Sequence, residues 1–187
     1  MLRPLATLLF GASTIALAQT PAPKPAPFLL TSPDIKAGAK IPESHALNLM
    51  GCTGGDVSPA LSWSGAPAAT KSFALTMYDP DAPTGSGFWH WTVYNIPANA
   101  TSLPEGAGDS TGHGLPVGAV QGPTDLGHPG YVGPCPPKGE VHHYQFKLFA
   151  LDIDRIDLPA GMTAAYLGFN IHMHTLAKAQ LTAIYSR

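Results

Sequence analysis

Three segments of the chain carry the side chains that could do chemistry. They are Asp79-Pro-Asp-Ala-Pro83, the aromatic run around His90, and Gly133-Pro-Cys-Pro-Pro-Lys-Gly-Glu-Val-His-His-Tyr144. A neutral imidazole offers one donor and one acceptor, and a protonated imidazole offers two donors, so His90 and His142 could grip an anion near neutral pH. We therefore expect a pocket for a small anionic or zwitterionic ligand.

The acidic residues and prolines of these segments fit the same pocket. Asp79 can orient a histidine, or accept a hydrogen bond from the ammonium of a zwitterionic headgroup. Prolines such as Pro83 and Pro136 restrict the backbone and hold binding groups in place. Taken singly, the same types of residue have structural interpretations, with inward histidines in the core and aspartates before prolines as turn formers.

The other histidines show no metal-site pattern. His172 and His174 lie about 200° apart on a helix, so they cannot ligate one ion together. His45, His113 and His128 fall in loops without ligand spacing. No Gly-x-Ser-x-Gly elbow, Walker loop or His-Glu-x-x-His occurs, so we expect no metal and no cofactor.

Alternating patterns predict the strands that position the three segments. Residues 72–78 alternate with both faces partly apolar, and residues 88–96 are rich enough in aromatic residues to belong in the centre of a sheet. In residues 142–151, Tyr144, Phe146 and Leu148 share one parity, which turns His142 inward and His143 outward.

One helix is expected, over residues 162–178. Met162, Ala165, Phe169, Met173 and Leu176 repeat at helical spacing and predict its buried face. Residues 181–186 then indicate a closing strand.

Composition favours a single mainly β domain. The chain has 187 residues with 20 Gly and 20 Pro, and only 12% of its residues are charged, which indicates many turns in an all-β sandwich or barrel. The net charge is -2 and no basic run occurs, so nucleic acid is excluded as the expected partner.

The N-terminal residues have the pattern of an export signal. Arg3 precedes an apolar stretch over residues 5–17, and Ala16-Leu17-Ala18 is a small-x-small cleavage site. The stretch is too short to span a bilayer comfortably, so we expect no transmembrane segment. This divides the chain into a signal peptide (1–18), a proline-rich tether (19–27) and a folded domain (28–187), in a periplasmic or secreted protein.

Cys52 and Cys135 are the only cysteines. An even number of cysteines in an exported chain favours a disulfide between them. The alternative is two separate buried thiols.

The three segments are accompanied by two further motifs, Ser58-Pro-Ala-Leu-Ser-Trp63 and the run from Gly65 to Phe73. On these residues the chain resembles the phosphatidylethanolamine-binding protein family, also called the Raf kinase inhibitor protein family, and in particular its bacterial exported branch. The resemblance implies a β-sandwich with one or two short helices near the C-terminus, and a pocket for phosphate-like anions or phospholipid headgroups. Carried over by position, the residues that it places at the pocket are Asp79, Asp81, Pro83, His90, Gly133, Pro136, His142 and Tyr144. The family's Gly-x-His-Arg segment reads Glu140-Val-His-His143 here, so the family arginine has no counterpart at that position.

These observations predict a non-catalytic binding protein. The family's kinase and protease inhibitors imply a protein partner as well, and the sequence leaves open whether the chain forms a homodimer. The alternative is a small hydrolase in which His142 or His90 acts as general base with Asp79 as its orienter. That hydrolase lacks an obvious nucleophile, because Ser86 lies in a flanking loop and Cys135 is expected to be oxidised.

Overall fold

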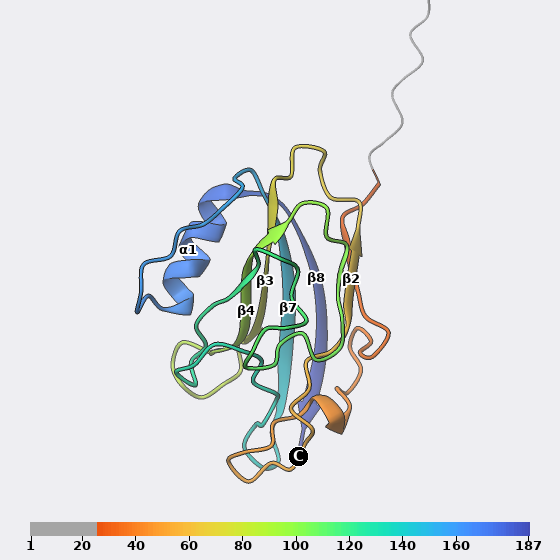
Figure 1. The fold of residues 1–187 in the computed structure, drawn as a ribbon. Coiled ribbons are helices and arrows are strands. Elements are labelled where there is room, and N and C mark those ends of the chain that lie inside the picture. The colour runs from red at the N-terminus through yellow and green to blue at the C-terminus, as the bar shows by residue number, and fades with distance from the viewer. Residues whose placement is uncertain (1–25) are drawn as a thin grey trace, which may run out of the picture.

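Two antiparallel β-sheets pack face to face and frame the protein (Figure 1). The computed structural model describes residues 26–187. The smaller sheet has the strand order β1-β2-β5 and the larger sheet the order β6-β4-β3-β7-β8. The strands are β1 (Leu29–Thr31), β2 (Leu61–Ser64), β3 (Ser72–Asp79), β4 (Phe88–Pro97), β5 (Ser102–Leu103), β6 (Val120–Gln121), β7 (Val141–Leu151) and β8 (Thr175–Ser186). The predicted mainly β sandwich is confirmed.

The main core lies between the two sheets and follows from the alternation of the strands. Phe73, Leu75 and Met77 of β3 face Trp63 of β2 across it, and Tyr144 and its same-parity neighbours in β7 fill the same layer. The parity predicted for β7 is confirmed, since its burial alternates from exposed Val141 to buried His142 and exposed His143. β3 is the central strand of the larger sheet. β4 lies next to it, between β3 and the two-residue strand β6.

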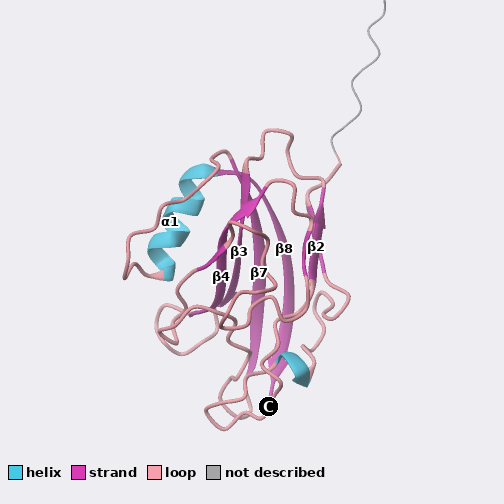
Figure 2. Ribbon diagram, in the orientation of Figure 1, coloured by secondary structure: helices cyan, strands magenta, loops and turns pink. Residues whose placement is uncertain are grey.

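Helix α1 (Ala164–His174) covers the other face of the larger sheet (Figure 2). It begins where the Thr163 hydroxyl accepts a hydrogen bond from the amide of Tyr166, which satisfies one free N–H of the first turn. A short 3-10 helix, η1 (Glu43–His45), precedes β2.

The predicted buried face of the helix was wrong. Ala164, Leu167 and Ile171 are buried, whereas Phe169 is 60% exposed and Met173 is 62% exposed. Both sets repeat at helical spacing, so periodicity could not choose between them. Packing against the sheet, where Tyr94 and Leu151 share a cluster with Leu167 and Ile171, selects the smaller set.

The predicted end of the helix was also wrong. The helix stops at His174, and β8 starts at Thr175 rather than near residue 181. Residues 175–178 pair with the end of β7, with Thr175 opposite Leu151 and Ala177 opposite Ala150. Pairing with this long neighbouring strand gives those residues backbone hydrogen bonds that outweigh the helix preference of Leu176, Ala177 and Lys178.

Two irregularities interrupt the regular alternation of side chains along β4. Asn95 has a φ of 57°, and the register shifts between Phe73 and Leu75 opposite it, so Ile96 packs in the same core as Val93 instead of on the opposite face. A second shift leaves His90 without a partner in β3, between Trp89 and Trp91. Bulges of this kind redirect side chains near functional sites.

The N-terminal predictions fall largely outside the described residues. The signal peptide and all but the last two residues of the tether lie in residues 1–25. Within residues 26–187, no helix has the length and apolar character needed to cross a bilayer.

The predicted disulfide is confirmed. Cys52 and Cys135 are bonded, with Cα atoms 6.0 Å apart and a sequence separation of 83 residues. The bond ties the loop after η1 to the proline-rich loop that leads into β7, and so joins two segments that no strand pairing connects directly.

Replacing both cysteines by serine should lower the free energy of unfolding by about 4 kcal/mol, because the crosslink restricts a long loop of the unfolded chain. Denaturant unfolding of the two proteins measures the difference. Thiol titration of the unfolded, non-reduced protein should find no free thiol, and two free thiols would contradict the bond.

Candidate functional site

A cavity of about 390 Å³ opens at the end of the larger sheet where β3 ends and β4 and β7 begin. The structure brings the three chemical segments of the sequence together around it. Of the residues expected at the pocket, Asp79, Pro83, His90, Gly133, Pro136, His142 and Tyr144 line the cavity.

Asp79 is a buried carboxylate at the last position of β3, with only 2% of its surface exposed. Its Oδ1 accepts a hydrogen bond from the amide of Asp81 at 2.8 Å, which closes the turn that follows the strand. Its Oδ2 lies 2.7 Å from Nδ1 of His142 on the neighbouring strand β7. A buried charge needs such partners, so Asp79 fixes the orientation of the His142 ring.

His142 lies between two carboxylates. Its Nδ1 contacts Asp79, and its Nε2 lies 3.0 Å from Oε2 of Glu140. Burial works against a charged ring, but the hydrogen bonds to Glu140 and Asp79 outweigh it and raise the pKa of His142. A carboxylate oxygen only accepts, so the protonated ring can donate from both nitrogens in this arrangement.

His90 has the opposite character. Its Nδ1 donates to the carbonyl of Val132 at 2.8 Å, which leaves Nε2 as the free nitrogen of the neutral ring. Complete burial lowers the pKa of His90 to about 4, despite the Val132 carbonyl and the nearby charge of Asp79. His90 therefore offers an acceptor to the cavity near neutral pH, which corrects the expectation that it would donate to an anion.

An acceptor pair faces the cavity as a result. His90 Nε2 lies 4.0 Å from Oδ2 of Asp79, and neither atom carries a proton when the imidazole is neutral and the carboxylate ionised. They cannot bond to each other, but a single donor group such as an ammonium or a water could bridge them.

Tyr144 supplies a donor at the same place. Its side chain is fully buried, its ring packs edge-on against His90 at 5.1 Å, and its hydroxyl finds no hydrogen-bond partner among residues 26–187. Burial and the negative charge of Asp79 raise its pKa, so the hydroxyl stays protonated. An unpartnered buried hydroxyl is costly, and its position on the cavity wall gives a ligand a group to satisfy.

Asp81 does not reach the cavity, unlike the other expected residues. Its Oδ2 accepts a hydrogen bond from the backbone amide of His143 and lies 2.7 Å from Nδ1 of the same residue. The His143 side chain is 56% exposed. His143 points away from the cavity, so its partner Asp81 also lies outside it. The contact between them connects the loop after β3 to β7.

Gly133 and Pro136 shape the wall instead of offering side-chain chemistry. A Cβ at Gly133 would overlap the backbone of His45 and Leu47, so only glycine allows this close approach. The Gly133 amide is anchored by Asp56 Oδ1 at 2.8 Å. The cavity wall is thus held by close backbone packing and by the Asp56 side chain.

Sequence reasoning missed several groups at the cavity. Leu47, Met50, Phe88, Leu126 and Val132 make much of its lining apolar. Arg187 lies at the rim, where Nε donates to the Pro136 carbonyl at 2.6 Å and Nη1 to the Gly51 carbonyl at 2.9 Å. These residues come from segments far apart in the sequence, so no local pattern indicated them. The sequence did show that Glu140 stands where the family motif has glycine.

The groups required by a hydrolase are less well placed. Within residues 26–187 no serine lines the cavity, and the sulfur of Cys135 is in the disulfide. The Thr84 hydroxyl lines the cavity but donates to the carbonyl of Gly87.

The protein is thus a β-sandwich with a part-apolar cavity lined by two histidines, a buried carboxylate and a tyrosine. Residues 31–186 match the family model of the phosphatidylethanolamine-binding protein. The chain is 49% identical over 174 residues to the UPF0098 protein YbcL of Escherichia coli K12, covering 92% of this chain and 95% of that protein. It is 51% identical over 157 residues to YbhB of the same organism, covering 84% and 99%.

A solved structure agrees with these sequence matches. The crystal structure of E. coli YbcL superposes with a TM-score of 0.84 at 50% identity, covering 87% of this chain and 99% of that one. The chain therefore belongs to the phosphatidylethanolamine-binding protein family, which is a family of ligand-binding proteins.

Removal of the Glu140 carboxylate should lower the pKa of His142. Since the folded-state pKa is raised, the charged ring contributes stability below about 6.5, the value of a free histidine, and loses it as pH rises through the folded value. NMR titration of the histidine ring signals in wild type and Glu140→Ala measures the change. Asp157→Ala, which removes an exposed carboxylate paired with Arg155, is the control and should leave His142 unchanged. Equal His142 titration in wild type and Glu140→Ala would contradict the assignment.

Proposed function

We propose that the protein is a non-catalytic binding protein that holds a small zwitterionic or anionic ligand, phosphate-like or phospholipid-headgroup-like, in this cavity. The observation that carries the proposal is the contact between His142 Nε2 and the Glu140 carboxylate at 3.0 Å. This nitrogen of a cavity-lining residue already contacts a carboxylate oxygen, and a ligand anion in the cavity can take the place of Glu140. The Glu140 side chain is 51% exposed, so it can move into solvent when the ligand enters.

The two sides of the cavity suit the two charges of a headgroup. Phosphate oxygens would accept from His142 Nε2 and from the unpartnered hydroxyl of Tyr144. An ammonium would bridge Asp79 Oδ2 and His90 Nε2, the acceptor pair 4.0 Å apart. The apolar lining would cover the carbon atoms between the charged ends.

Arg187 offers a positive charge where the family arginine is missing. Position 143 is a histidine whose ring pairs with Asp81 outside the cavity, so His143 cannot supply a positive charge to a ligand there. The guanidinium of Arg187 lies on the rim and is held in place by two carbonyl groups. It would attract an anion to the mouth and stay exposed to solvent.

A protein partner is the second part of the proposal. Met50 lines the cavity and is 69% exposed. Exposed apolar side chains at the mouth of a binding site suit contact with another protein. A hydrolase remains the rival, and it would need an activated nucleophile within reach of His142.

Calorimetric titration with phosphoethanolamine tests the binding function. His142→Gln should weaken binding about ten- to hundredfold, because it removes a charge-assisted hydrogen bond. Tyr144→Phe should weaken it about tenfold without loss of stability, because the hydroxyl has no partner to lose in the free protein. Wild-type affinity should fall as pH rises through the raised pKa of His142.

His143→Ala is the matched control and should leave affinity unchanged, since its ring lies outside the cavity. Glu140→Ala, measured below the pKa of His142, should bind phosphate a few-fold more tightly, because the displaced contact is a half-exposed ion pair of about 1 kcal/mol. A loss of affinity in His143→Ala equal to that in His142→Gln would reject the proposed pocket.

We also propose that the chain belongs to the exported branch of the family and acts in the periplasm or outside the cell. Support comes from Arg3, the apolar residues 5–17 and the small residues Ala16 and Ala18. The disulfide between Cys52 and Cys135 agrees, since such bonds persist in oxidising compartments.

Protein secreted by the native host should begin at Gln19, because cleavage is expected after Ala18. Mass spectrometry of the intact secreted chain measures its first residue. Secreted material that retains Met1 would overturn the export proposal and would leave the binding proposal standing.

A further inference from the structure

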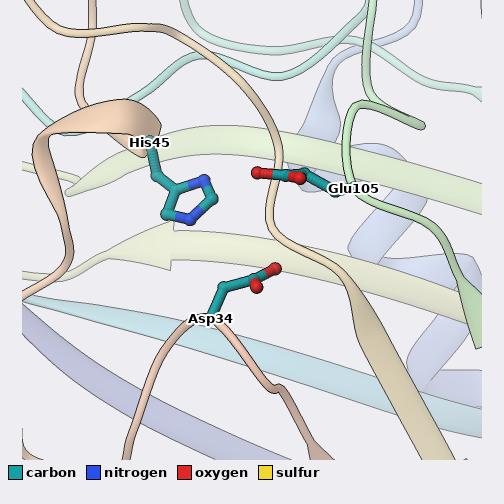
Figure 3. A group of neighbouring side chains, drawn as sticks. All are labelled: Asp34, His45 and Glu105. Carbon is teal, nitrogen blue, oxygen red and sulfur yellow. The ribbon is translucent and has the colours of Figure 1, made fainter.

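We propose that Asp34, His45 and Glu105 form a zinc site, separate from the ligand cavity. The three side chains come from the loop after β1, the last residue of η1 and the loop after β5, and Figure 3 shows them converging. One ligand atom from each lies within 4.8 Å of the other two. None of the three residues lines the cavity around His142.

The histidine is prepared to act as a ligand. His45 is 2% exposed, and its Nδ1 lies 2.8 Å from the carbonyl oxygen of Val57. A carbonyl only accepts, so Nδ1 carries the proton and Nε2 of the neutral ring keeps its lone pair. Metal-binding histidines are commonly fixed in this way by a hydrogen bond from the other nitrogen. Among the described residues, Nε2 of this buried ring has no hydrogen-bond partner.

The two carboxylates lack a counter-charge. In the part of the chain that the structure describes, neither Asp34 nor Glu105 pairs with a lysine or arginine, and His45 forms no ion pair with either. Asp34 is positioned by the amide of Ala60, which donates to Oδ2 at 2.7 Å and leaves Oδ1 available. Two acids this close repel each other unless a cation lies between them.

The ligand types select the cation. One imidazole and two carboxylates with a free fourth position match the donors of zinc sites, whereas magnesium prefers oxygen ligands in a strict octahedron. Zinc bonds of about 2.1 Å in a tetrahedron place the ligand atoms about 3.4 Å apart, so the site must contract slightly on binding. The exposed side chain of Glu105 can provide that movement.

A bound ion would also stiffen the cavity wall. His45 is two residues from Leu47, which lines the cavity, and the carbonyl of His45 accepts from the Tyr131 hydroxyl at 2.9 Å. Zinc would hold this segment to the loops after β1 and β5. Sequence spacing gave no sign of the site, because its three ligands come from separate loops.

Zinc chloride titrated into the chelator-treated full chain, followed by calorimetry, tests the proposal. We expect one zinc ion per chain and a higher melting temperature with zinc, because the ion binds only the folded site. Asp34→Asn and Glu105→Gln keep the side-chain shapes and should each weaken zinc binding at least about tenfold, and both should lose the thermal shift. Magnesium should bind far more weakly.

The histidines of α1 provide a control outside the cluster. His172→Gln with His174→Gln removes two histidines that cannot ligate one ion together on a helix and should leave the zinc affinity unchanged. The proposal is overturned if zinc binding survives in both acid variants, or if it is lost only in the α1 double variant. Since phosphoethanolamine binding is measured separately, failure of the zinc site leaves the cavity proposal intact.

Discussion

The buried carboxylate of Asp79 is the constraint on which the cavity depends. A carboxylate with 2% exposure is unstable unless it is paired, and Asp79, the last residue of β3, finds its partner on the neighbouring strand β7. His142 meets this need at 2.7 Å, and its charge then requires a second acceptor at Nε2. Glu140 takes that place in the free protein. Burial keeps His90 neutral in spite of this carboxylate, so His90 Nε2 is an acceptor 4.0 Å from Asp79 Oδ2. The buried carboxylate therefore fixes the orientation of His142, and burial fixes the charge state of His90.

Loop contacts hold the cavity wall in place beside these strands. Gly133 packs backbone against backbone, its amide is held by Asp56, and the disulfide joins the loop to the segment after η1. A preformed cavity loses little conformational entropy when a ligand binds. Breaking one partner of a buried ion pair costs roughly 3–5 kcal/mol, so the Asp79 and His142 pair also couples the binding site to the stability of the sheet.

The sequence predicted features that depend on local periodicity or on a shared motif. Alternation placed His142 inward and His143 outward, and the two cysteines were paired correctly. It failed where tertiary contacts decide between equal local patterns. The exposed face of α1, the early start of β8, the bulge at His90 and the position of Asp81 all depend on neighbouring strands. Arg187 and the Asp34, His45 and Glu105 cluster were missed, because their members are separated along the chain.

A crystal structure of the protein with phosphoethanolamine tests the central claim most directly. The account predicts a phosphate oxygen within hydrogen-bond distance of His142 Nε2 and Tyr144, the ammonium between Asp79 and His90, and Glu140 turned into solvent. A ligand bound elsewhere, with the contact between Glu140 and His142 unchanged, would contradict it.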